Sequence, residues 1–315
     1  MVSPLGSEDF LRVLKRAKKE DDLGTRIANA LELIQGALDE LDEQAVALSF
    51  NGGKDCTVLL HLFAVALYAR HATVPSELRI RRVPVEIPTI AQSATTESIP
   101  EVHGTTTETS ESGAGAQTKA HQLESGASLY PPVKSIYITA PNHFPELDDF
   151  TDDSVTRYGM DLYRFGGNMK AALTEYLSCG GGRGVRGILV GTRTGDPNGR
   201  KFTHPGQEPS DKAGVKPIDP TDPHWPQFLR IHPILDWTYS QIWAFLRELD
   251  VPYCHLYDEG YTSLGSTKNT VPNPLLRKDD GTYEPAWKCE SDLENRLTSV
   301  TDGSQERGGR LDSSA

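Results

Sequence analysis

The sequence has few cysteines, no long hydrophobic run and fewer positive than negative charges. Four cysteines occur in 315 residues, and none forms a C-x-x-C pair, so a disulfide framework or zinc site is not expected and a reducing compartment fits. No apolar run approaches a membrane span, and the N-terminus has no secretory signal pattern. The net charge of -12 argues against a nucleic-acid-binding surface. We therefore expect a cytoplasmic protein that binds neither nucleic acid nor membrane.

Aromatic residues are missing from one internal segment. Between about Val85 and Leu129 there is no Phe, Tyr or Trp and one lysine, Lys119. Ser, Thr, Glu and Gly dominate, with neither the helical nor the strand period. Such a segment cannot bury enough apolar surface to offset the entropy lost on ordering. We predict a disordered insertion at about 85–130 within a domain that spans 45–300.

The most informative stretch is a glycine turn between two apolar runs. Ala45–Leu48 reads as a strand and Thr57–Phe63 as a helix, and Ser-Phe-Asn-Gly-Gly-Lys-Asp joins them at 49–55. A glycine turn at the start of a helix directs backbone N–H groups and the positive end of the helix dipole at an anion. The spacing differs from the Walker and dinucleotide motifs. We predict a phosphate-binding loop with Lys54 as a mobile charge; an ordinary turn with two glycines is the alternative.

The remaining chain alternates strands and helices. This order predicts an α/β fold with a doubly wound, mostly parallel sheet, helices on both faces, and N-terminal helices at 1–44 packed on the core. Ligands of such sheets bind beyond the carboxyl ends of the strands. The glycine turn and the residues after Thr139 and Gly191 should therefore lie on one rim. The expected helices are 8–19, 25–41, 146–158, 168–179 and 236–246, and the later strands 133–139, 161–165 and 186–192.

A second polar loop follows the strand that ends near Gly191. It reads Gly-Thr-Arg-Thr-Gly-Asp-Pro over 191–197, and its arginine and aspartate are poor core residues. A salt bridge in a surface loop is the alternative interpretation. The polar, proline-rich stretch 198–225 is longer than an ordinary connection and is a candidate for a substrate-covering loop.

Four motifs together resemble a known family. These are Ser49–Asp55, Gly191–Pro197, Ile234–Trp243 and Tyr257–Ser266. They are similar to the eukaryotic, fungal-type FAD synthases (FMN adenylyltransferases), which have the PAPS reductase-like, adenine nucleotide alpha hydrolase-like fold. The resemblance implies a reaction of ATP with FMN that gives FAD and pyrophosphate, with Mg²⁺ as the metal. It also implies a C-terminal flavin-binding extension, with the tail 301–315 closing on the site.

The resemblance also assigns roles to individual residues. The implied phosphate-binding residues are Ser49, Phe50, Asn51, Gly52, Gly53, Lys54 and Gly191. The implied flavin-binding residues are Arg193, Thr194, Asp196, Arg307 and Arg310. Catalytic roles fall to Asn51, Asp55, Asp196, Arg307 and Arg310, with Asn51 and Asp55 as the magnesium ligands. Asp55 as an ordinary first-turn helix acid is the alternative. Which atoms of the 139–146 loop meet adenine stays open.

Two other functions fit parts of the pattern. A PAPS or APS reductase needs a reactive cysteine near its C-terminus, and Cys289 is the nearest candidate, although an inert thiol fits its context better. A non-catalytic nucleotide or flavin sensor would keep the pocket, but has less need of the charges in the glycine turn. We expect a monomer, with apo-flavoproteins as candidate recipients of FAD.

Overall fold

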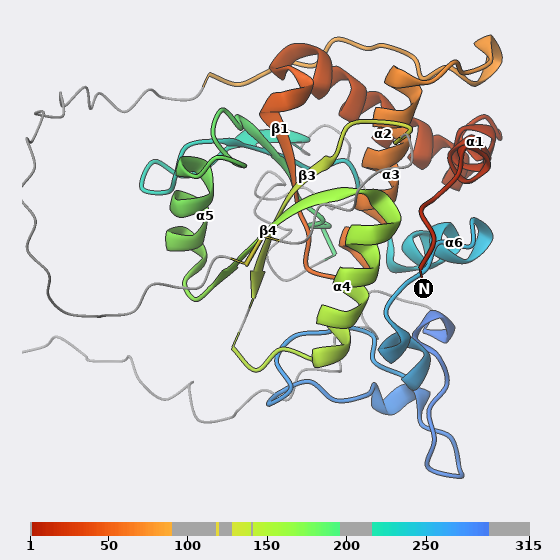
Figure 1. Ribbon diagram of the computed structural model, residues 1–315. Helices are drawn as coiled ribbons and strands as arrows, with labels where there is room; N and C mark the ends of the chain where they lie inside the picture. Colours follow the sequence, from red (N-terminus) through yellow and green to blue (C-terminus); the bar gives the residue numbers. More distant parts are fainter. Residues whose placement is uncertain (1, 90–117, 120–127, 140, 196–215, 290–315) are drawn as a thin grey trace, which may run out of the picture.

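A seven-stranded mixed sheet forms the centre of the molecule (Figure 1). The computed structural model describes residues 2–89, 118–119, 128–139, 141–195 and 216–289. The strands are β1 (Val46–Ser49), β2 (Thr118–Lys119), β3 (Val133–Thr139), β4 (Met160–Gly166), β5 (Gly187–Leu189), β6 (Ile218–Pro220) and β7 (Leu229–Ile231). Their order is β2-β4-β3-β1-β5-β7-β6. The five inner strands are parallel and the two edge strands antiparallel, which confirms the predicted mostly parallel sheet.

Helices cover both faces of this sheet, as predicted. They are α1 (Ser7–Arg16), α2 (Asp22–Leu41), α3 (Lys54–His71), α4 (Pro145–Tyr158), α5 (Met169–Ser178) and α6 (Tyr239–Glu248). Side chains of β1 alternate between the two cores: Val46 and Leu48 join the large core with α1–α4 and α6, whereas Ala47 joins the small core under α5. Figure 1 shows α5 alone on its side of the sheet.

Helix α3 lies at the middle of the large core. Every residue from Thr57 to Tyr68 is buried, because α3 is apolar all round rather than on one stripe. Such a helix needs partners on every side, and α1, α2 and α6 supply them. The N-terminal helices therefore complete the core around the helix that follows the glycine turn.

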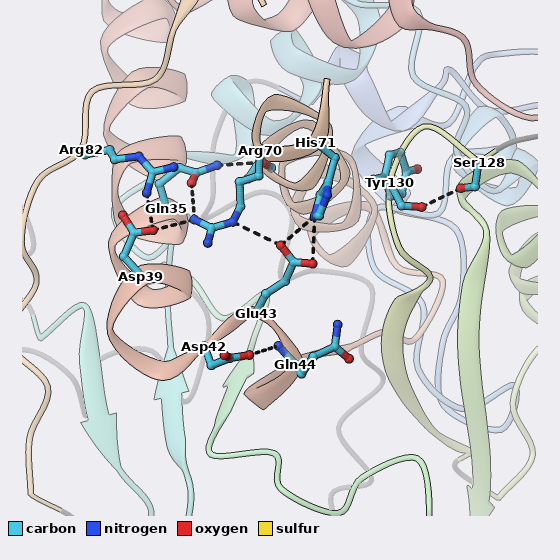
Figure 2. Close-up of polar contacts among 11 residues, drawn as sticks. Gln35, Asp39, Asp42, Glu43, Gln44, Arg70, His71, Arg82, Ser128 and Tyr130 are labelled. Atoms are coloured by element: carbon cyan, nitrogen blue, oxygen red, sulfur yellow. Dashed lines mark hydrogen bonds and ion pairs between the residues drawn. The ribbon is translucent and has the colours of Figure 1, made fainter. Parts of the chain in front are cut away.

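The carboxyl end of α3 is held by charged side chains of neighbouring elements (Figure 2). Arg70 contacts Gln35 at 3.0 Å, Asp39 at 2.6 Å and Glu43 at 3.2 Å. His71 lies 3.0 Å from the same Glu43. Basic residues in the last turn also interact favourably with the negative end of the helix dipole.

Part of the predicted insertion pairs with the sheet. Thr118 and Lys119 form β2, the antiparallel neighbour of β4, whereas the sequence analysis expected no structure from 85 to 130. At the start of the predicted insertion, Val85 packs against Gly36 of α2. A Cβ built on Gly36 would lie 2.6 Å from Cγ1 of Val85. The prediction of disorder was therefore wrong for these residues. Most of the segment lies outside the described residues.

Candidate active site

The glycine turn has the tight geometry that its sequence predicts. Gly52 has φ +73°, a conformation that L side chains rarely adopt. A Cβ at this position would lie 3.1 Å from Leu147 Cδ2 and 3.2 Å from Thr151 Oγ1 of α4. The buried Phe50 enters the turn, and its N–H donates to the Ile136 carbonyl of β3 at 2.9 Å. Sheet and helix thus fix the turn from both sides.

Two backbone donors at the start of α3 already have partners within the protein. The Gly53 N–H donates to Asn51 Oδ1 at 3.0 Å, and the Lys54 N–H donates to the Tyr257 hydroxyl at 2.9 Å. The first N–H groups of a helix have no partner in the helix itself, which makes them available to side chains or to an anion. The exposed Asn51 and the half-buried Ser49 flank these donors.

Three charged side chains form a cluster at this end of α3. One oxygen of Asp55 lies 3.0 Å from Lys54 Nζ and the other 2.7 Å from Arg193 Nε. Arg193 is 0% exposed, Lys54 4% and Asp55 19%. Burial opposes ionisation of Asp55, but the two cations outweigh it and lower the pKa of the carboxyl. Asp55 is therefore ionised and contacts a cation with each of its two oxygens.

The loop after β5 closes onto the same place. A Cβ on Gly191 would lie 2.9 Å from Cys56 Sγ and 3.2 Å from the Cys56 nitrogen, so only glycine allows this approach of β5 to α3. The Thr194 N–H donates to the Leu235 carbonyl at 2.7 Å. The structure thus brings Gly191, Arg193 and Thr194 beside the glycine turn, on one rim.

The loop after β3 belongs to the same rim. The Asn142 carbonyl accepts hydrogen bonds from the backbone N–H of Thr267 at 2.7 Å and from its hydroxyl at 3.0 Å. The rings of Phe144 and Tyr261 meet edge to face at 5.3 Å. The stretch 257–266 singled out in the sequence is thereby tied to this loop.

Three expectations about individual residues change. Lys54 is not mobile, because its ammonium is buried between Asp55 and two tyrosine rings. Arg193 faces Asp55 and the Trp237 carbonyl, so in this arrangement its guanidinium is not open to a flavin. Both oxygens of Asp55 face cations, which does not fit a magnesium ligand. Asp196, Arg307 and Arg310 lie outside the described residues.

The described ranges also contain no cluster of three or more His, Cys, Asp or Glu side chains that could hold a metal ion.

Sequence reasoning missed two aromatic residues of the cluster. The Lys54 ammonium lies 5.2 Å from the ring centroid of Tyr239 and 5.9 Å from that of Tyr257. Both tyrosines are nearly fully buried. The sequence analysis placed Tyr257 in the motif Tyr257–Ser266, but nothing in the local pattern pointed to Lys54, which is 203 positions away.

Comparison with known proteins agrees with this geometry. The model of the phosphoadenosine phosphosulfate reductase domain family matches residues 188–272. A probable FAD synthase of Schizosaccharomyces pombe is 29% identical over 288 residues, which cover 91% of this chain and 80% of the relative. A probable FAD synthase of Caenorhabditis elegans is 31% identical over 90% of this chain, which spans 42% of that relative. The chain is a homologue of the eukaryotic FAD synthases.

Solved structures support the same fold. The FMN adenylyltransferase of Candida glabrata superimposes with a TM-score of 0.65 at 21% identity, covering 95% of this chain and 98% of that one. The same relative has been solved in complex with FAD and inorganic pyrophosphate. The predicted PAPS reductase-like fold is therefore confirmed for this FAD synthase homologue.

Two further features bear on the alternatives. Cys289 is buried and its sulfur accepts from Asn273 Nδ2 at 3.5 Å, an environment unlike that of a reactive thiol. Across the ranges that the structure covers, no helix has the length and apolar character needed to cross a membrane.

Proposed function

We propose that the protein is an FMN adenylyltransferase, which transfers AMP from ATP to the phosphate of FMN and releases pyrophosphate. One observation carries the proposal: the glycine turn opens α3 directly above a buried cluster in which both Lys54 and Arg193 contact Asp55. The two cations beneath the turn and the positive end of the helix dipole both favour an anionic ligand at this end. The names of the relatives indicate which anions to test.

The reaction asks little of the protein in covalent chemistry. An oxygen of the FMN phosphate attacks the α-phosphorus of ATP, and the bond between that phosphorus and the bridging oxygen to the β-phosphate breaks. A phosphomonoester has a second pKa of about 6, so FMN is largely ionised at neutral pH and needs no general base. The requirements are in-line placement and neutralisation of charge. The glycine turn, with the cations Lys54 and Arg193 beneath it, supplies the neutralisation of charge.

The residues divide into two proposed groups. The turn from Ser49 to Lys54, together with Gly191, holds the ATP phosphates. Thr194 at the rim, together with Asp196, Arg307 and Arg310, recognises the flavin and closes the site. The guanidinium groups of the two arginines match phosphate oxygens. Asp55 and Arg193 act from beneath the turn by setting its charge. ATP and FMN are thus the proposed partners.

Magnesium dependence is part of the proposal, although Asp55 is not proposed as its ligand. Mg²⁺ keeps several waters and is commonly bound through substrate phosphates and one or two carboxylates. The ATP phosphates are therefore its expected principal ligands here.

A flavin or nucleotide sensor is the principal rival. The purified protein is incubated with ATP, FMN and MgCl₂, and the flavins are separated by chromatography while pyrophosphate is assayed. We expect FAD and pyrophosphate in equal amounts, and no pyrophosphate without FMN. Tight flavin binding with no FAD would instead identify a sensor. Sulfite formed from PAPS and a thiol donor would identify a sulfonucleotide reductase.

A further inference from the structure

A buried tyrosine from the C-terminal half of the chain contacts the phosphate-binding turn. Tyr257 lies in the short 3₁₀ helix η5 (His255–Glu259). Its hydroxyl accepts the hydrogen bond from the Lys54 N–H at 2.9 Å. Lys54 is the first residue of α3, so this N–H is one of the donors that a helix leaves without an internal partner. The hydroxyl therefore fixes the backbone where the turn becomes a helix.

The ring of the same tyrosine contacts the other end of Lys54. The ammonium lies 5.9 Å from the Tyr257 centroid and 5.2 Å from the Tyr239 centroid, within the range at which a cation is attracted to an aromatic face. Asp55 Oδ2 approaches the ammonium at 3.0 Å. Tyr257 thus holds both the backbone and the charged group of one residue.

Tyr257 is itself rigidly placed. Its ring meets Trp243 of α6 edge to face at 5.4 Å, and its N–H donates to the Cys254 carbonyl. Gly260 ends η5 with φ +87°, and its carbonyl accepts from the Asn273 N–H. Burial raises the pKa of Tyr257 well above its usual value, so the hydroxyl stays neutral. The position of Lys54 is therefore set by α6 and the segment that follows it.

We propose that Tyr257 is a positioning residue for ATP turnover: it aligns the first N–H of α3 and the Lys54 ammonium before ATP arrives. This inference rests on the proposed function. Because the Lys54 N–H is already bonded to Tyr257, the ATP phosphates take other donors of the turn. A group aligned in advance stabilises developing charge without reorganisation during the reaction.

The test compares two tyrosines that pack on the same tryptophan. Tyr257→Phe keeps the ring and removes the hydroxyl that contacts the turn. Tyr253→Phe is the matched control, because Tyr253 also meets Trp243, at 5.0 Å, but its hydroxyl bonds Asp258 at 2.9 Å, away from the turn. For Tyr257→Phe we expect kcat/KM for ATP to fall about tenfold while KM for FMN stays within about twofold. For Tyr253→Phe both values should stay within about twofold.

A second measurement does not depend on turnover. Hydrogen exchange of the Lys54 amide should be slow in the wild-type protein and faster in Tyr257→Phe. Equal ATP kinetics for wild type and Tyr257→Phe, or a KM for FMN that rises as much as kcat/KM for ATP falls, would overturn the inference. If Tyr257→Phe does not fold, fast exchange of the wild-type Lys54 amide would do the same. Absence of FAD from the wild-type protein would refute the proposed function, while the exchange measurement would still decide the role of Tyr257.

Discussion

The two ends of α3 carry ion-pair clusters that differ in burial and in the backbone beside them. At the carboxyl end two guanidinium groups, Arg70 and Arg82, face two carboxylates, Asp39 and Glu43 (Figure 2). At the amino end Lys54 and Arg193, both almost fully buried, contact Asp55 beneath the glycine turn. The cluster at the carboxyl end joins α3 to neighbouring elements and holds the helix in place. The cluster at the amino end places two cations beside a glycine turn and the positive end of the helix dipole, which is what an anionic substrate requires.

Arg193→Met is expected to have the largest effect on activity. The substitution removes the buried guanidinium that contacts Asp55 and leaves Lys54 as the one cation of this cluster beneath the turn. We expect FAD formation to fall about 100-fold, as for loss of an aligned charge-stabilising group. Steady-state kinetics with saturating FMN would measure it. Wild-type rates in a folded Arg193→Met protein would show that the cluster serves stability alone.

Arg70→Met tests the cluster at the carboxyl end of α3 in the same way. Arg70 is the shared partner of Gln35, Asp39 and Glu43, and the substitution leaves these partly buried groups without it. We expect the free energy of unfolding to fall by about 2 kcal/mol, measured by urea denaturation. FAD formation should stay within about twofold, because no proposed substrate contact changes. A large loss of activity at unchanged stability would contradict the distinction between the two ends.

These two clusters also show what sequence can predict. The glycine turn and its flanking strand and helix are local, so residues 49–55 were enough to predict the turn. The parallel sheet followed from alternating strands and helices. The burial of Lys54 and Arg193 was not predictable, because their common partner Asp55 is 138 positions from Arg193 and no local pattern pairs them. The edge strands β2 and β6 were missed because three residues or fewer show no period.

His61 lies midway along α3, between the two clusters, and predicts how the stability of the protein depends on pH. Burial lowers the pKa of His61 to about 4, and its Nδ1 contacts the Tyr158 hydroxyl at 2.8 Å. The unfolded chain binds a proton near the ordinary pKa of 6.5, so below that value unfolding takes up a proton that the folded state refuses. Stability should therefore fall by about 2 kcal/mol between pH 7 and pH 5. In His61→Gln this fall in the free energy of unfolding between pH 7 and pH 5 should vanish. An unchanged fall would mean that other groups cause it.

The smallest expected effects come from two glycine variants, which together distinguish backbone strain from loss of a substrate contact. Gly52 and Gly159, the residue after α4, have similar left-handed conformations, with φ +73° and +60°. A Cβ on Gly159 meets nothing within 4 Å, so Gly159→Ala should cost about 1 kcal/mol of stability with unchanged kinetics.

Gly52→Ala carries the same strain, and its methyl group also approaches Leu147 and Thr151, so the turn must shift. The stability loss should be of similar size, about 1 kcal/mol, but KM for ATP should rise in this variant alone, because the shifted N–H groups no longer meet the phosphates. Denaturation and ATP titrations on both variants measure the two effects separately. Equal KM values in both variants would mean that the glycine turn at the amino end of α3 does not contact ATP.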